Sequence, residues 1–290
     1  MSQEKTSVWK IILVVVVIIF ALIFLRVLFR GGINNNNGNN PYVPPAQVET
    51  VKMNLAYGPH AQQKFDFYSD GEDSDTLFIL VHGGAWIAGD KNLFDEHSRF
   101  FVDKGYSVAN MNYRLAPDSK YDAQLYDIAD LINYVGLNRE QFNLQLNYRI
   151  VLVGHSAGAH LSALYALKES QYGTRNIDYA ITLAGPYDLE IPGNNVWSDP
   201  VKDSFLGEVT RAEASPVNHV YSGEQTKFLL ISAGQSDGVV DKRHYEVFLE
   251  ELENKNVFVE GHVIAGRNHG SLVNLIPSND IVAQEIADFI

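Results

Sequence analysis

The chain has 290 residues, a formal net charge of −13 at pH 7 and no cysteine. The lack of cysteine excludes disulfide bonds, thiol catalysis and lipid attachment at a cysteine, but it leaves the cellular compartment open. The acidic balance disfavours nucleic acids and anionic lipid surfaces as partners of the folded part of the chain.

The first element in chain order is an apolar segment at residues 8–29, in which Lys10 and Arg26 are the only charged side chains. At a rise of 1.5 Å per residue, a helix of this length spans about 33 Å, which is enough to cross a bilayer when the basic side chains reach the interfaces. We therefore expect a transmembrane anchor at residues 11–29, preceded by a short leader at residues 1–10.

A cleaved signal peptide is the alternative interpretation of this segment. Residues 26–32 are bulky and basic and contain no small-x-small cleavage site, which favours an anchor that stays attached. Basic residues flank the apolar core on both sides, so their distribution does not fix the orientation. The short leader favours an N-terminus inside the cell and a folded domain on the extracytoplasmic side of the membrane.

Residues 30–45 form an Asn-, Gly- and Pro-rich segment that has too few apolar residues to build a core, and we expect it to be a linker. The folded domain then covers residues 46–290, a normal size for one α/β unit. Only about thirty residues separate its start from the first clear strand, which leaves no room for a large N-terminal cap. The segment between Gly185 and Gly223 is the best candidate for a partial lid.

Within this domain, short apolar runs alternate with longer stretches of helical composition. We predict strands at residues 77–81, 106–111, 149–153, 178–183, 227–232 and 257–263, and helices at residues 92–104, 121–135, 157–169, 240–254 and 280–290. This alternation predicts an α/β fold with a mostly parallel central sheet and helices on both faces.

A glycine-rich loop follows the strand predicted at residues 77–81, in the sequence His82-Gly83-Gly84-Ala85-Trp86. Consecutive glycines let the backbone turn so that its N–H groups point into a cavity instead of pairing in a sheet. We expect His82 to hold this loop in place through hydrogen bonds rather than to transfer protons.

A serine lies between two glycines in the sequence Gly154-His155-Ser156-Ala157-Gly158, after one predicted strand and before one predicted helix. A sharp turn there exposes the hydroxyl group above the sheet, and the helix directs its N-terminal amides toward whatever lies over Ser156. The pattern alone also fits an ordinary strand-to-helix turn. Its occurrence together with the glycine-rich loop, in this order, favours a nucleophilic serine.

Three motifs resemble those of serine esterases of the α/β-hydrolase superfamily, in the branch related to hormone-sensitive lipase. They are HGGAWI at residues 82–87, NYRLAP at 112–117 and GHSAGAH at 154–160. The resemblance covers most of residues 46–290 and implies the α/β-hydrolase fold. Within the branch, AYG at 56–58 and FDFY at 65–68 resemble the small feruloyl and acetyl-xylan esterase-like group, and kynurenine formamidases and prenylcysteine methylesterases share the three motifs.

The resemblance implies a catalytic triad in the order serine, acid, histidine. Asp237 follows the strand predicted at residues 227–232 and is the expected acid, with Asp241 as its nearest rival. His269 lies in the loop after the last predicted strand and is the expected base, whereas His262 lies within that strand. Ser156 would then be the nucleophile.

Further roles follow from the same resemblance. Gly83, Gly84 and Ala157 are expected to form the oxyanion hole through their backbone N–H groups. Asp127 resembles an aspartate that supports the Asn-Tyr-Arg segment, and Trp86 and Tyr187 are the candidates for the wall of the substrate pocket. His155 and His160 are expected only to pack beside the serine.

The implied activity is hydrolysis of short-chain carboxylic esters by a membrane-anchored serine carboxylesterase. An arylformamidase and a prenylcysteine methylesterase-like hydrolase are the enzymatic alternatives, and a catalytically silent binding module of the same fold is the non-enzymatic one. The expected partners are a small-molecule ester and, through the anchor, a membrane. No metal or organic cofactor is expected.

Overall fold

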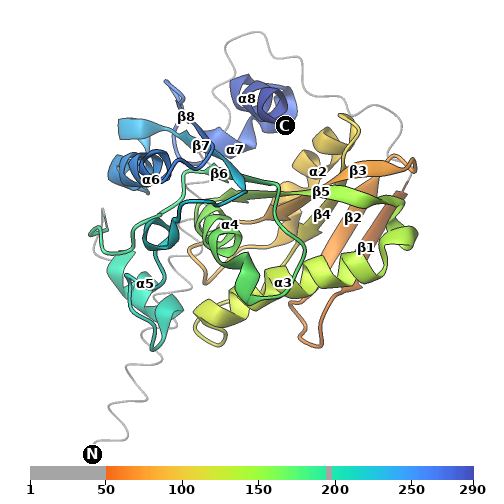
Figure 1. The fold of residues 1–290 in the computed structure, drawn as a ribbon, viewed down its shortest axis with the longest axis horizontal. Helices are drawn as coiled ribbons and strands as arrows, with labels where there is room; N and C mark the ends of the chain where they lie inside the picture. Colours follow the sequence, from red (N-terminus) through yellow and green to blue (C-terminus); the bar gives the residue numbers. More distant parts are fainter. Residues whose placement is uncertain (1–49, 194–197) are drawn as a thin grey trace, which may run out of the picture.

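The computed structural model describes residues 50–193 and 198–290. In this part of the chain eight strands form one sheet with the order β1-β2-β4-β3-β5-β6-β7-β8 (Figure 1). The strands are β1 (Thr50–Ala56), β2 (Lys64–Ser69), β3 (Ser74–Val81), β4 (Ser107–Met111), β5 (Leu144–His155), β6 (Tyr179–Leu183), β7 (Lys227–Ser232) and β8 (Val259–Val263). Strands β3 to β8 pair in parallel, whereas β2 pairs in an antiparallel manner with both β1 and β4. The prediction of a mostly parallel sheet is therefore confirmed.

The α-helices of the described residues are α2 (Asp95–Val102), α3 (Tyr121–Leu137), α4 (Ala157–Lys168), α5 (Ser198–Leu206), α6 (Lys242–Asn254), α7 (Ser271–Asn274) and α8 (Ile281–Phe289). They cover both faces of the sheet, as Figure 1 shows. Alternate residues of β3 belong to two separate cores, with Leu77, Ile79 and Val81 in one and Phe78 and Leu80 in the other. Helices α3, α4 and α6 close the first core, and α2 and α8 close the second.

The antiparallel strands β1 and β2 were not predicted from the sequence. The only signal for β2 is that Phe65 and Phe67 alternate with other residues. Strand β1 is half exposed and contains the charged Lys52. Helix α5 was also missed, because it lies in the polar segment that we expected to act as a partial lid.

The predicted anchor at residues 11–29 and the linker at residues 30–45 lie outside the described residues. Among the helices that the structure describes, none is long and apolar enough to span a bilayer.

Candidate active site

The turn between β5 and α4 holds Ser156 in a strained backbone conformation with positive φ, at φ of 56° and ψ of −119°. A Cβ atom on Gly154 would lie 2.3 Å from the carbonyl oxygen of Gly158, and one on Gly158 would lie 2.0 Å from that of Val81. Only glycine fits at these two positions. The N–H of Ser156 donates a 2.8 Å hydrogen bond to the carbonyl of Leu183, which ties the turn to the end of β6.

The glycine-rich loop packs directly against this turn. A Cβ on Gly83 would approach the carbonyl of His155 to 2.9 Å and the Cβ of Ser156 to 3.2 Å. Gly84 has φ of +127°, and a Cβ there would lie 1.9 Å from the carbonyl of Ala88. Because Ala157 is the first residue of α4, its N–H is one of those that a helix leaves without an internal acceptor. Gly83 of the loop and the start of α4 at Ala157 thus both lie against the serine.

His82 holds the glycine-rich loop in place. Its Nδ1–H donates a 2.7 Å hydrogen bond to the carbonyl of Gly83, and its ring stacks on Tyr113 at 4.3 Å. Burial lowers the pKa of His82 to about 4, so that the ring is neutral at neutral pH. These contacts agree with a supporting role rather than proton transfer.

Asp237 and His269 lie together in the structure, with Oδ2 of the carboxylate 3.0 Å from Nδ1 of the ring. The other carboxylate oxygen accepts 2.9 Å hydrogen bonds from the N–H groups of Val239 and Val240. Burial raises the pKa of Asp237, but the hydrogen bond to His269, its charge and the two N–H groups together lower it below the usual value. The carboxylate is therefore ionised at neutral pH and able to orient the imidazole. Its rival Asp241 instead caps α6 and pairs with Arg243.

His155 is a residue whose role the sequence analysis missed. Its Nε2–H donates a 2.8 Å hydrogen bond to the backbone carbonyl of His269, and the two rings lie 4.6 Å apart. Burial, and then the nearby His269, lower the pKa of His155 to about 3. The residue that precedes Ser156 thus holds the loop that carries the expected base.

Trp86 forms a wall of the site in a fixed orientation. Its Nε1–H donates a 3.2 Å hydrogen bond to Nδ1 of His160, and its ring stacks on Phe205 of α5 at 4.7 Å. The backbone of Ala85 and Trp86 is left-handed, with φ of 52° and 62°. Such a pair of non-glycine residues is unfavourable and is found where the surroundings hold it. His160 therefore positions Trp86 in addition to packing beside the serine.

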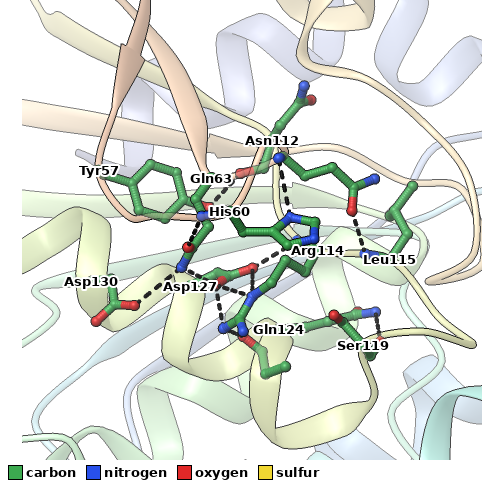
Figure 2. Close-up of polar contacts among 12 residues, drawn as sticks. Tyr57, His60, Gln63, Asn112, Arg114, Leu115, Ser119, Gln124, Asp127 and Asp130 are labelled. Atoms are coloured by element: carbon green, nitrogen blue, oxygen red, sulfur yellow. Dashed lines mark hydrogen bonds and ion pairs between the residues drawn. The ribbon is translucent and has the colours of Figure 1, made fainter.

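Asp127 lies at the centre of a buried polar network that supports this wall (Figure 2). It accepts hydrogen bonds from the N–H and the guanidinium group of Arg114, at 2.6 and 2.8 Å, and from the side chain of Gln63 at 2.8 Å. The segment after Arg114 donates the N–H of Ala116 to the carbonyl of Trp86 at 2.9 Å. Asp127 thus supports the Asn-Tyr-Arg segment, as the resemblance implied.

A cavity of about 90 Å³ opens beside Ser156. Among the described residues it is lined by Ala85, Trp86, Ser156, Ala157, Pro186, Pro192, Gly193, Ser198, Val201, Lys202, Val239, Val240, Asp241 and His244. The segment expected to act as a lid therefore contributes part of the wall.

Tyr187 does not line this cavity. Its ring stacks on Phe248 at 4.6 Å in the core, and its hydroxyl group accepts a hydrogen bond from the N–H of Gly185. Lys202 and His244 line the cavity although the sequence analysis did not single them out. No group of three or more acidic, histidine or cysteine side chains that could hold a metal ion occurs in residues 50–193 and 198–290.

Known proteins resemble this chain in sequence and in fold. The BD-FAE family model matches residues 65–252. The kynurenine formamidase of Drosophila melanogaster is 26% identical, over 76% of this chain and 74% of that protein. A probable isoprenylcysteine alpha-carbonyl methylesterase of Arabidopsis thaliana is 33% identical, over 77% of this chain and 58% of that protein. The crystal structure of esterase B from Lactobacillus rhamnosis has a TM-score of 0.74 at 19% identity, over 99% of this chain and 93% of the other.

Proposed function

Because the chain belongs to the BD-FAE family of α/β-hydrolases, we propose that it is a serine carboxylesterase that hydrolyses short-chain carboxylic esters. The observation that carries this proposal is the 3.0 Å contact between Asp237 and His269. The loop that contains His269 is hydrogen-bonded to His155, the residue directly before Ser156. A carboxylate, an imidazole and a serine on a strained turn, supplied in this chain order, are the parts of an acyl-transfer site.

The first half of the reaction forms an acyl-enzyme. His269 accepts the hydroxyl proton of Ser156 as its oxygen attacks the ester carbonyl, while Asp237 holds the imidazole in the required tautomer and stabilises its charged form. The backbone N–H groups of Gly83, Gly84 and Ala157 bind the oxyanion that develops. His269 then gives its proton to the departing alcohol, and the acyl group stays on the serine.

The second half releases the acid. Water replaces the alcohol, His269 accepts a proton from it, and the resulting hydroxide attacks the acyl-enzyme carbonyl. The same three N–H groups bind the second oxyanion, and loss of one such donor costs about 10²–10³-fold in kcat in other acyl-transfer enzymes. The proton returns from His269 to Ser156 as the acid leaves.

The size of the cavity supports a small acyl group. Its volume of about 90 Å³ is below the 300–1,000 Å³ that is typical of sites for drug-sized ligands. Trp86 and Val240 are among the side chains that line this small volume. We expect p-nitrophenyl acetate to butyrate to be the best substrates, with kcat/KM falling by octanoate.

Formamide hydrolysis is the second candidate, since several of the similar proteins are kynurenine formamidases. The same triad attacks a formamide carbonyl, but His269 must then protonate an amine instead of an alcohol. A panel of p-nitrophenyl, feruloyl and acetyl-xylan esters, a prenylcysteine methyl ester and N-formylkynurenine separates the candidates by kcat/KM. Absence of turnover on all of them, in a folded protein, favours a binding module of the same fold.

We place the enzyme at a membrane on the basis of the apolar segment at residues 8–29. The full-length protein should sediment with membranes and need detergent for extraction, whereas a variant that begins at Ala46 should stay in the supernatant and hydrolyse soluble esters equally well. A full-length chain with an intact N-terminus in the supernatant contradicts this placement. Protease accessibility in intact cells tests the expected extracytoplasmic side.

A further inference from the structure

The cavity beside Ser156 is lined by apolar residues, among them Val201, Val239 and Val240, and by the nitrogen-bearing residues Lys202 and His244. These two lie near each other, because His244 binds the backbone N–H of Asp188 and Lys202 contacts the carbonyl of Leu189. We call this part of the lining the polar end of the cavity. Neither Lys202 nor His244 takes part in the proton transfers of ester hydrolysis. Both side chains are almost fully buried, with exposed fractions of 4% for Lys202 and 3% for His244. Burial of such groups is unfavourable unless they have a partner.

The tautomer of His244 follows from its surroundings. Its Nδ1 accepts a 3.2 Å hydrogen bond from the backbone N–H of Asp188, so in the neutral ring the hydrogen is on Nε2. Burial, and then the charge of Lys202, lower the pKa of His244 to about 3 and keep the ring neutral. Among the described residues, no acceptor is recorded for its Nε2–H. His244 therefore offers the cavity a hydrogen-bond donor.

Lys202 is held loosely by the chain around it. Its ammonium group donates a 2.7 Å hydrogen bond to the carbonyl of Ile191, while its contacts with the carbonyl of Leu189 and the carboxylate of Asp199 are both 3.4 Å. A lysine ammonium group has three hydrogens, and contacts of 3.4 Å are long for such a charged donor. The ammonium group can therefore exchange one of these two long contacts for an oxygen atom of a ligand.

The charges around the cavity favour an anion at this end. Lys202 is the only cation among the described lining residues, and Asp241 is the only acid. The carboxylate of Asp241 already binds the backbone N–H of Arg243 at 2.9 Å and its guanidinium group at 3.0 Å. Arg243 thus offsets the charge of Asp241. Asp199, which pairs with Lys202 at 3.4 Å, is shared with Arg211 at 3.0 Å. The charge of Lys202 is therefore only partly offset, and it is the positive charge that a substrate meets at this end.

We propose that Lys202 and His244 form a carboxylate-binding subsite, and that the preferred substrates are small esters or formamides with a carboxylate at a short distance from the scissile carbonyl. A carboxylate has two oxygens, one for the ammonium group and one for the Nε2–H. This inference rests on the proposed function, because it needs the hydrolytic reaction at Ser156. The carboxylate belongs either to the acyl part or to the leaving group of the substrate, and one pair of substrates tests each case.

Two matched substrate pairs test the subsite in the full-length protein in detergent. Monoethyl glutarate and ethyl pentanoate differ only by a carboxylate in place of a methyl group on the acyl part. The pair of 4-acetoxybutanoate and butyl acetate differs in the same way on the leaving group. Titration of the released acid near neutral pH gives kcat/KM for all four. We expect the anionic ester to be preferred about tenfold or more within one pair, and the identity of that pair places the carboxylate.

Variants then assign the preference to the two residues. Lys202→Met removes the charge at similar length, and His244→Phe removes the donor at similar shape, so both should reduce the preference about tenfold. Lys227→Met is the matched control, because Lys227 is an exposed lysine that does not line the cavity. It should keep the wild-type preference.

Equal kcat/KM within both pairs for the wild-type protein overturns the proposal without any variant, even if one variant does not fold. A preference that persists in Lys202→Met and in His244→Phe overturns it as well. If none of the four esters and no p-nitrophenyl acetate is hydrolysed, the proposed function itself has failed. Hydrolysis of the neutral esters without a preference for the anionic ones contradicts the subsite alone.

Discussion

The Nε2–H of His155 donates a 2.8 Å hydrogen bond to the backbone carbonyl of His269. His155 is the last residue of β5, directly before the proposed nucleophile, and His269 lies in the loop between β8 and α7. The side chain next to the nucleophile therefore fixes the position of the loop that carries the base. This contact links the two parts of the proposed triad that are farthest apart in the sequence.

Substitution of His155 should act on the chemical step. His155→Phe keeps a ring of similar shape but removes the donor, so the loop loses its attachment and His269 shifts relative to Ser156. We expect kcat on p-nitrophenyl acetate to fall about 10–100-fold with a smaller change in KM. The control His262→Gln changes a histidine of β8 whose recorded ion pairs are with Glu260 and Glu285. A lower melting temperature with kcat within twofold of the wild type would show that His155 only stabilises the fold.

Trp86 should control the length of the acyl chain. Trp86→Ala removes a side chain that is held by His160 and Phe205, which enlarges the cavity. Each additional methylene that contacts a wall gains about 0.8 kcal/mol. The kcat/KM on hexanoate and octanoate should therefore rise relative to that on acetate, and this change should be larger than the loss of kcat/KM on acetate itself. Phe258→Ala, at an exposed aromatic residue outside the cavity, should keep the wild-type profile. An unchanged chain-length profile in Trp86→Ala would contradict its place as a wall.

The network at Asp127 should contribute to stability as well as to the site. Asp127→Asn removes the charge that binds Arg114, and we expect the free energy of unfolding to fall by about 2 kcal/mol, because the half-buried guanidinium group loses its counterion and charge-assisted hydrogen bonds. Urea denaturation measures this loss. The control Asp122→Asn changes an exposed acid of the same helix and should cost less than about 0.5 kcal/mol. Equal stability of the two variants would contradict the role of the network.

The raised pKa of Glu169 should make the stability of the fold depend on pH. Burial, offset in part by the N–H of Ile177 and reinforced by Glu224, raises the pKa of its carboxyl group from 4.5 to about 7. The folded state binds this proton more tightly than the unfolded state, so the contribution is full below about pH 4.5 and is lost as the pH rises to about 7. Glu169→Gln mimics the protonated form. It should raise the melting temperature at about pH 8 and leave it unchanged at about pH 4, whereas the exposed control Glu253→Gln should do neither. A melting temperature that does not rise at about pH 8 refutes the assignment.

The parts of the site that depend on local geometry could be predicted from the sequence. Gly154 and Gly158 are required by contacts within the turn and with the adjacent strand, so their spacing around Ser156 marks the turn. Asp237 could be selected because an acid just after a parallel strand lies at the same edge of the sheet as the serine. The boundaries of α4 follow the predicted helix at residues 157–169 closely for the same local reason.

The parts that depend on distant packing could not be predicted. Tyr187 follows a strand and was expected at the pocket, but the ring of Tyr187 stacks on Phe248 of α6 in the core. Lys202 and His244 are ordinary residues of polar helices in the sequence, and only the placement of α5 and α6 brings them to one cavity. The hydrogen bond of His155 likewise joins residues whose proximity no local pattern encodes.

Covalent labelling tests the central claim most directly. The full-length protein is treated with a fluorophosphonate probe, and the modified residue is located by mass spectrometry of the digested protein. The account predicts a single adduct on Ser156, no adduct and no ester turnover in a folded Ser156→Ala variant, and normal labelling in the control Ser162→Ala, a buried serine of α4. Labelling at another residue, or retained turnover in Ser156→Ala, would contradict the assignment of Ser156 as the nucleophile.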